Sequence, residues 1–205
     1  MIKNIIFDFG GVLYDIDYNL TINQLIKLSG NPNLLIPTNN LIEVSSSFEK
    51  GLIKENEFRD TLKLIYKLPH INDDNLDGIW NALLIGLKHN AFFTLELLSK
   101  KYNLVLLSNT NAIHYNKFKS EIYGFEHIFS KLYFSHLIGM RKPDLEIYNY
   151  VCSDSGFNKE ETLFIDDSLE NIEGAIMTNL KVYNCKRNGE LSELYNTIEI
   201  IAHTS

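Results

Sequence analysis

The 205-residue sequence has few cysteines and no long apolar run, and each shortage excludes a class of protein. Its two cysteines, Cys152 and Cys185, are too few for a disulfide framework, so we expect two thiols in a reducing compartment, with a single bond between them as the alternative. No stretch approaches the length of a membrane span, and the apolar run at residues 1–7 is too short for a signal peptide. The sequence therefore predicts a soluble, cytoplasmic protein.

Positive charge is also in short supply. The chain carries 19 Lys and Arg against 26 Asp and Glu, which gives a formal net charge of −7. Nucleic acids and anionic membranes attract basic surfaces, so we expect neither as a partner. A small anionic ligand remains compatible with this balance if positive charge is concentrated locally. Since 45% of the residues are hydrophobic and 22% are charged, the composition is that of a globular protein.

The hydrophobic pattern divides the chain into two kinds of segment. Between residues 17 and 87, apolar residues recur at helical spacing with no clear strand, and the pattern is broken at residues 30–32, 37–40, 51 and 69. From residue 91 onward, helical stretches alternate with short apolar strands at residues 103–107, 131–134, 162–166 and 180–183. A further apolar strand covers residues 3–8. Such alternation is typical of βαβ units and a parallel sheet.

We therefore predict an α/β fold in which a Rossmann-like parallel sheet is interrupted after its first strand by an α-helical insertion. The core would comprise residues 1–14 and 88–205, and the insertion residues 15–87. Ligands of such sheets bind beyond the carboxyl ends of the strands. The polar residues that follow each predicted strand are accordingly the first candidates for a site.

Four of these strand ends carry chemistry-bearing residues. Asp8 follows the first strand, Ser108 ends the second, Lys142 lies in the loop after the third, and Asp166 and Asp167 end the fourth. Together they offer a nucleophilic carboxylate, a hydroxyl, a cation and a carboxylate pair that suits a metal ion. This is the set of groups that phosphoryl transfer requires.

The order and spacing of these groups resemble the haloacid dehalogenase-like (HAD) hydrolase superfamily. The matching segments are Asp8-Phe9-Gly10-Gly11-Val12-Leu13, Leu107-Ser108-Asn109-Thr110, Lys142, and Phe164-Ile165-Asp166-Asp167 through Asn171. The helical insertion resembles the cap of subfamily I, and Phe48-Glu49-Lys50-Gly51-Leu52-Ile53 resembles a recurring cap segment. Within the superfamily, the first motif is most similar to bacterial α-glucose-1-phosphate phosphatases.

The resemblance implies a role for each motif residue. Asp8 would attack phosphorus and form an aspartyl phosphate, with Lys142 neutralising charge. Mg²⁺ would be held by Asp8, the Gly10 carbonyl and Asp167, with Asp166 supporting Lys142. The opposite assignment, with Asp166 as the direct ligand, stays open. The residues that the resemblance implies for phosphate contact are Gly10, Gly11, Ser108, Asn109 and Lys142.

Two neighbours of these motifs have competing interpretations. Asn171 would orient a metal-bound water, or it is an ordinary exposed helix residue. Arg141 is the rival of Lys142 for the cationic role, and we favour Lys142 because the corresponding lysine of the family often precedes proline. His114 is expected on a helix surface or behind the site. Trp80 and the aromatic residues of the insertion are expected in its core, with a substrate pocket as the alternative.

One position departs from most phosphatases of the superfamily, which have a second Asp two residues after the nucleophile. Here that position is Gly10. General acid–base help is typically worth about 10²–10⁴-fold, so its loss favours a good leaving group over a mutase reaction. Asp15 or Asp17 would compensate, or both simply begin the first helix of the insertion.

We therefore expect a Mg²⁺-dependent phosphatase that acts on a small phosphorylated metabolite, with a sugar phosphate as the expected substrate class. A non-catalytic phosphometabolite-binding protein is the alternative that Gly10 suggests. A metal-independent 2-haloacid dehalogenase is less favoured, because Lys142 and the Asp166-Asp167 pair suit a metal-dependent enzyme. A monomer or a weak homodimer fits the sequence.

Overall fold

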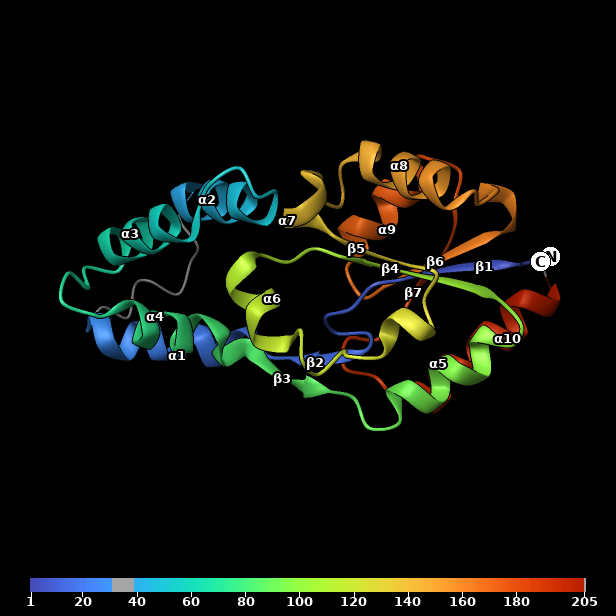
Figure 1. Ribbon diagram of the computed structural model, residues 1–205, viewed down its shortest axis with the longest axis horizontal. Helices are drawn as coiled ribbons and strands as arrows, with labels where there is room; N and C mark the ends of the chain where they lie inside the picture. The colour runs from blue at the N-terminus through green and yellow to red at the C-terminus, as the bar shows by residue number, and fades with distance from the viewer. Residues whose placement is uncertain (31–38, 205) are drawn as a thin grey trace.

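The computed structural model, which describes residues 1–30 and 39–204, is built on one parallel sheet (Figure 1). Its five strands lie in the order β5-β4-β1-β6-β7. They are β1 (Asn4–Phe7), β4 (Asn103–Ser108), β5 (Lys131–Phe134), β6 (Thr162–Asp166) and β7 (Lys181–Asn184). Phe7 at the end of β1 pairs with Leu106 on one side and Ile165 on the other. The predicted parallel sheet is confirmed.

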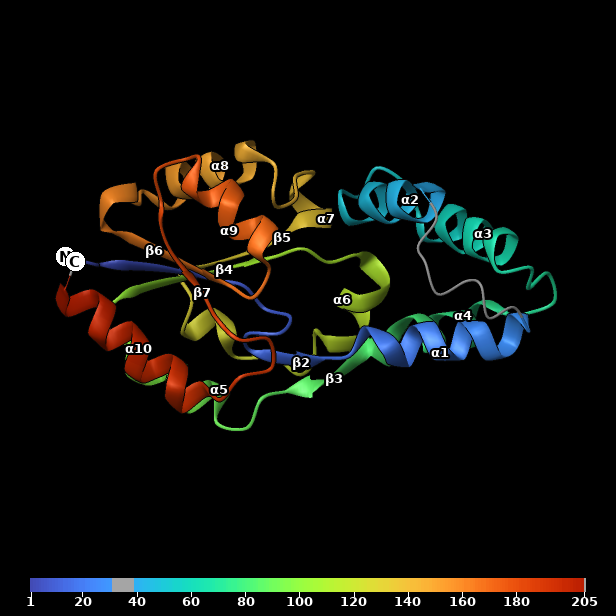
Figure 2. The same cartoon turned by 180° about the vertical axis from the view of Figure 1, so that it is seen from behind.

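Helices cover both faces of this sheet (Figures 1 and 2). The helices α8 (Leu145–Ser155) and α9 (Leu169–Ile176) lie on one face, and α5 (Ala91–Ser99) and α10 (Leu191–Thr204) lie on the other. Ile5 and Phe7 pack into one hydrophobic cluster, whereas Ile6 between them packs into the other. Because both faces of the strands are buried, the strands are apolar throughout, as the sequence indicates.

The described residues between Tyr18 and Trp80 form a second body of four helices, drawn at the left of Figure 1, which we call the cap. They are α1 (Tyr18–Ser29), α2 (Asn39–Glu49), α3 (Glu55–Ile65) and α4 (Asp73–Trp80). Phe48 and Phe58 stack with their ring centroids 4.2 Å apart in its interior. Gly30 ends α1 with a φ of 65°, as expected for a break, whereas the predicted breaks at 31–32 and 37–38 lie outside the described residues.

Between the cap and the sheet, the prediction of no strand in residues 17–87 is wrong. The strands β2 (Tyr14–Ile16) and β3 (Leu84–Leu87) pair antiparallel where the chain enters and leaves the cap. Strands this short give too few residues for a recognisable alternation, and their pairing joins positions about seventy residues apart. The division into 1–14, 15–87 and 88–205 stays a prediction, although β2 spans the first boundary.

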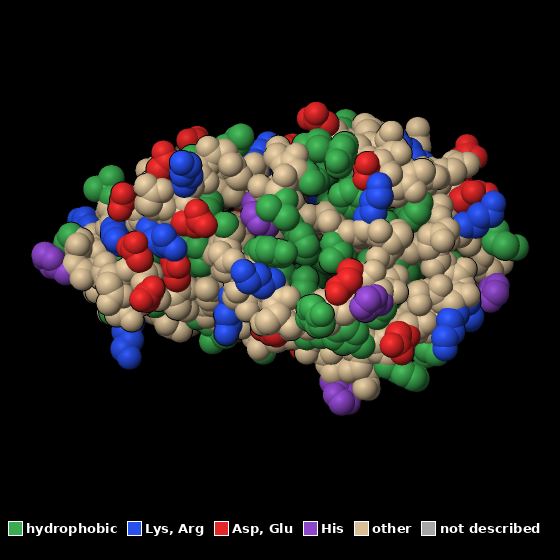
Figure 3. All heavy atoms as spheres, in the orientation of Figure 1, with side chains coloured by type: hydrophobic (Ala, Val, Ile, Leu, Met, Phe, Trp, Pro, Cys, Tyr) green, Lys and Arg blue, Asp and Glu red, His purple; other side chains and the backbone are tan. Residues whose placement is uncertain are grey.

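Short helices connect these parts. The helix α6 (Ala112–Phe118) follows β4 and α7 (Ser135–Ile138) follows β5, while 3-10 turns occupy Asn81–Leu83, Phe125–His127 and Lys159–Glu161. Ile113 of α6 belongs to the hydrophobic cluster of the cap, so α6 packs against both bodies. In Figure 3, hydrophobic side chains gather in the middle of the face shown, over α6, and charges of both signs are interspersed around them.

The end of α2 is joined to the core by two ion pairs and a close backbone contact. Arg141 Nε donates to Glu49 Oε2 at 2.8 Å, and Lys50 Nζ lies 2.7 Å from Asp144 Oδ2. Gly51, the next residue along the chain, adopts a φ of 65°, and a Cβ there would lie 2.3 Å from the carbonyl oxygen of His136. A glycine is therefore required where the cap meets α7.

The structure also describes the state of the two cysteines and the length and composition of the helices. Cys152 and Cys185 are both buried and unbonded to one another, as two free thiols. Within residues 1–30 and 39–204, none of the helices combines the length and the apolar composition that crossing a membrane requires.

The contact at Gly51 predicts a specific loss of stability. Gly51→Ala should lower the free energy of unfolding by about 1–3 kcal/mol more than Gly30→Ala does. Both glycines have a φ of 65°, so both variants pay the cost of a left-handed alanine, but no atom lies within 4 Å of a Cβ at Gly30. Urea denaturation of the two variants measures the difference. Equal losses would show that the cap does not rest on this contact.

Candidate active site

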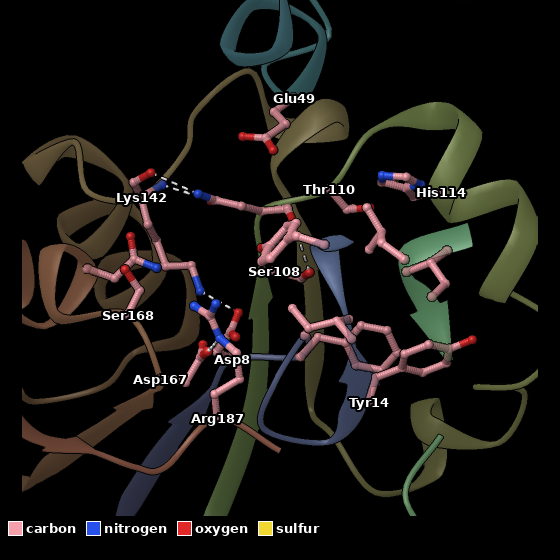
Figure 4. A pocket seen from close by; sticks show the side chains of 18 of the residues that line it. Asp8, Tyr14, Glu49, Ser108, Thr110, His114, Lys142, Asp167, Ser168 and Arg187 are labelled. Atoms are coloured by element: carbon pink, nitrogen blue, oxygen red, sulfur yellow. Dashed lines mark hydrogen bonds and ion pairs between the residues drawn. The ribbon is translucent and has the colours of Figure 1, made fainter. Parts of the chain in front are cut away.

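The carboxyl ends of the three central strands meet at one cavity of about 220 Å³ (Figure 4). Asp8 follows β1, Ser108 ends β4, and Asp167 follows β6. The strand order places β4 on one side of β1 and β6 on the other. The loops that follow such strands leave the sheet in opposite directions and surround a crevice at their carboxyl ends. The polar strand ends singled out in the sequence are thus brought together.

A buried lysine joins these strand ends. Lys142 Nζ donates to Asp8 Oδ1 at 2.5 Å, to Asp166 Oδ2 at 2.7 Å and to the carbonyl oxygen of Leu107 at 2.9 Å. All three donor positions of the ammonium are used. Lys142 is only 1% exposed and Asp166 is fully buried, so neither charge is solvated by bulk water. Arg141, the rival of Lys142, instead pairs with Glu49.

Burial and mutual attraction set the protonation of this group. Burial raises the pKa of Asp8, and the negative charges of Asp166 and Asp167 add to the shift, although Lys142 opposes it. Burial acts to lower the pKa of Lys142, but its attraction to Asp166 and Asp8 outweighs this and raises that pKa above its usual range. Lys142 is therefore a permanent cation. The three carboxylates of Asp8, Asp166 and Asp167 face two cations, Lys142 and Arg187, which leaves an excess of negative charge that a divalent cation would balance.

The backbone of Lys142 is held in place by Asn109. The Asn109 amide nitrogen donates to the Lys142 carbonyl at 2.8 Å, and its Oδ1 accepts from the Lys142 N–H at 2.9 Å (Figure 4). This double contact uses Oδ1 and one of the two amide hydrogens of the Asn109 side chain. Ser108, which is 2% exposed, lines the cavity beside it.

Asp166, which ends β6, and Asp167, which follows it, have different surroundings. Asp166 Oδ1 accepts from the Ser168 N–H at 2.8 Å, and the Asn171 amide lies 3.0 Å from both Asp166 oxygens. With Lys142, these contacts occupy the Asp166 carboxylate. The Asp167 carboxylate lines the cavity and accepts a hydrogen bond from Arg187 Nε.

The carboxylates provide a set of oxygen ligands. One oxygen from each of Asp8, Asp166 and Asp167 lies within 4.8 Å of the others. Carboxylate and carbonyl oxygens together with water are the ligands that Mg²⁺ prefers, and Gly10 borders the same cavity. The residues present therefore fit a magnesium ion.

The two glycines after Asp8 have different roles. Gly11 has a φ of 81°, and a Cβ there would lie 2.6 Å from Asp167 Oδ2, so only glycine fits. Its N–H already donates to the Tyr14 carbonyl at 2.7 Å, and Gly11 does not border the cavity, although the sequence suggested it for phosphate contact. At Gly10 a Cβ would meet nothing nearer than Ile16 at 3.5 Å. Space alone does not demand a glycine at Gly10.

Neither proposed substitute for the missing acid–base borders the cavity. Asp17 is the N-cap of α1, where its side chain accepts from the Asn19 N–H at 2.9 Å, as the interpretation of a helix start predicted. Asp15 lies in β2 instead of the helix, and its Oδ1 is 3.7 Å from Lys88 Nζ.

The cavity is also bordered by residues to which the sequence gave no catalytic role, among them Tyr18, Glu49, His114 and Arg187. Burial raises the pKa of Glu49 against the attraction of Arg141. Arg187 lies over the ring of Tyr18, 5.4 Å from its centroid. No local pattern marks these residues, because each approaches the site from a distant part of the chain. The recurring cap segment was the one signal that included Glu49.

His114 lies deeper than a helix-surface residue. It is 9% exposed, and its Nδ1 lies 2.8 Å from Asn81 Oδ1. Because an amide oxygen only accepts hydrogen bonds, the ring proton lies on Nδ1. Its ring stacks on Trp80 at 5.5 Å. Burial lowers the pKa of His114 to about 3, so the imidazole is neutral at physiological pH.

The buried lysine predicts a large effect on stability. Lys142→Met should lower the free energy of unfolding by about 3–5 kcal/mol, because Asp8 and Asp166 lose their shared cation in the interior. Lys131→Met is the matched control, since Lys131 pairs with Asp154 at the surface and such pairs contribute about 0–1 kcal/mol. Chemical denaturation measures both. A loss at Lys142 no greater than that at Lys131 would contradict the network's structural role.

The chain is similar in sequence to known phosphatases. The chain is 31% identical over 178 residues to a D-ribitol-5-phosphate phosphatase of Bacteroides thetaiotaomicron, covering 84% of this chain and 86% of the relative. It is 28% identical over 173 residues to a sesquiterpene phosphatase of Aspergillus oryzae, covering 83% of each. These relatives confirm the predicted class of enzyme, a hydrolase of phosphate monoesters.

Solved structures give the same result. A HAD family enzyme from Bacteroides thetaiotaomicron has a TM-score of 0.86 at 34% identity, covering 95% of this chain and 98% of its own. A variant of that enzyme in complex with magnesium and inorganic phosphate has a TM-score of 0.84 at 33% identity, over 95% and 99%. These structures bear out the expected Mg²⁺. The haloacid dehalogenase-like hydrolase family model matches residues 2–177, and the chain belongs to that family.

Proposed function

We propose that the protein hydrolyses the phosphate monoester of a small metabolite, with Asp8 as the nucleophile. The observation that carries this proposal is the contact of Lys142 Nζ with Asp8 Oδ1 at 2.5 Å, at a cavity that Asp167 and Ser108 also border. A carboxylate beside a permanent cation can approach a phosphate dianion, which a lone buried carboxylate would repel.

The residues suggest the following course. Lys142 holds Asp8 Oδ1, which leaves Oδ2 to attack phosphorus as the bond to the leaving alcohol oxygen breaks. Ser108 and the Asn109 N–H would hold the phosphoryl oxygens. Water then attacks the aspartyl phosphate, which releases inorganic phosphate and restores the Asp8 carboxylate. The bound Mg²⁺ would neutralise charge on the transferring phosphoryl group.

Of Asp166 and Asp167, we favour Asp167 as the direct metal ligand. The Asp166 oxygens are already occupied by Lys142, Ser168 and Asn171. Asp166 and Asn171 would accordingly position the lysine, and the Gly10 carbonyl would complete the protein ligands. A water oriented by Asn171 remains compatible with its position at the cavity.

A sugar or sugar-alcohol phosphate is the substrate class that we propose for this site. The curated bacterial relative acts on D-ribitol 5-phosphate by name, and polar side chains such as Thr110, Ser168 and Glu170 border the cavity. Gly10 provides no side chain to protonate the leaving oxygen, so esters with good leaving groups should react fastest. The monomer or weak dimer and the cytoplasmic location stay predictions from the sequence.

Asp8→Asn should abolish turnover, because an amide is a poor nucleophile. The assay is phosphate release from acetyl phosphate and a panel of sugar phosphates, with and without Mg²⁺. Mass spectrometry of the unmodified protein should detect a phosphoryl adduct on Asp8, which a pure binding protein would not form. Retained activity in the variant would remove Asp8 from the nucleophile role. Metal-free halide release from a 2-haloacid would favour the dehalogenase alternative.

Asp167→Asn should weaken Mg²⁺ binding at least tenfold, measured by isothermal titration calorimetry without substrate. Glu170→Gln is the control, since Glu170 also borders the cavity but lies outside the carboxylate group. Its affinity for Mg²⁺ should be unchanged. The assignment would be reversed if Asp166→Asn lost Mg²⁺ binding while Asp167→Asn kept it.

A further inference from the structure

A second cavity, of about 230 Å³, lies between the cap helices and the start of α6, and we call it the cap chamber. Its lining includes Ile22, Leu25, Phe48, Tyr66 and Trp80 from the cap and His114 from α6. Most of these side chains are aliphatic or aromatic. The chamber therefore differs from the catalytic cavity, which charged and amide side chains surround.

Several polar side chains of the chamber already have partners within the protein. Thr21 Oγ1 donates to the Ile79 carbonyl at 2.9 Å, and Asn111 Oδ1 accepts from the His114 N–H at 3.0 Å. His114 is neutral and bonded to Asn81, and Glu49 is paired with Arg141. An apolar group would leave these contacts intact, and most of the remaining lining is aliphatic or aromatic.

The cap chamber lies beside the catalytic cavity, and the two share part of their lining. Tyr18, Glu49, Leu83 and His114 border both cavities. In Figure 4, Glu49 extends from the cap above Ser108, and His114 lies across the pocket from Lys142. A phosphate ester whose phosphorus lies at Asp8 would thus direct its alcohol portion past these four residues toward the chamber.

The size of the chamber also allows an apolar occupant. An apolar cavity of about 150 Å³ stays dry and binds benzene. The cap chamber is larger, so it has room for a short alkyl or terpenoid group.

We propose that the cap chamber binds the apolar part of the leaving alcohol, so that monophosphates of aliphatic alcohols are substrates in addition to sugar phosphates. The proposal rests on the phosphatase function argued above. The reaction is the same hydrolysis: the ester bond to phosphorus breaks, water supplies the new oxygen on phosphate, and the alcohol leaves with a proton.

The first test is a series of linear alkyl phosphates from methyl to octyl, assayed with Mg²⁺. We expect kcat/KM to rise about two- to fourfold per methylene until the chamber is filled, as burial of apolar surface predicts. Ser45→Phe should flatten the series because the larger side chain occupies part of the chamber. Ser46→Phe, one position along α2 and outside the chamber lining, should keep the rise.

The second test does not depend on catalysis. Trp80 is the single tryptophan of the chain and lines the chamber, so its fluorescence reports on occupancy. Titration with 1-hexanol in the absence of Mg²⁺ should give a saturable change in the unmodified protein and in Ser46→Phe, but none in Ser45→Phe. Ribitol should give none.

The outcomes separate the two proposals. Saturable hexanol binding in a protein that hydrolyses no phosphate ester would leave the chamber proposal standing and refute the proposed function. Hydrolysis of sugar phosphates, with a flat alkyl series and no fluorescence change, would refute the chamber proposal alone. A rise in the alkyl series that Ser45→Phe leaves intact would also overturn it, because the alkyl group would then bind elsewhere.

Discussion

The ammonium of Lys142, held between Asp8 and Asp166, is the interaction on which the rest of the site depends. It contacts residues at the ends of β1, β4 and β6, so it joins the three central strands at the edge where ligands of such sheets bind. A cation this deeply buried requires full hydrogen bonding, and both carboxylates and a carbonyl provide it. The same contacts leave the group with an excess of negative charge, which makes the cavity suitable for a divalent cation.

The loop that carries Lys142 also holds the cap. Arg141 pairs with Glu49 and Asp144 pairs with Lys50, so the residues on either side of the buried lysine anchor the end of α2. The cap therefore places Glu49 beside the cavity through the same segment that neutralises the nucleophile. The buried lysine network and the cap are thus joined through one short loop.

The absence of an acid–base side chain at Gly10 has its consequence in this setting. The structure has room for a larger residue there, and neither Asp15 nor Asp17 borders the cavity. Catalysis then relies on positioning and charge neutralisation, which favours substrates that need little help in leaving.

Sequence alone determined the parallel sheet, the helical cap and the polar strand ends, because hydrophobic periodicity and the residues that follow a strand are local properties. It also identified Asp8, Lys142 and Asp166-Asp167, since their order along the chain resembles a known family. Only tertiary structure decided that the Asp166 oxygens are occupied, that β2 pairs with β3, and that Glu49 and His114 border two neighbouring cavities. These facts depend on contacts such as that of Glu49 with Arg141, 92 positions apart, and no local pattern encodes how such distant segments pack.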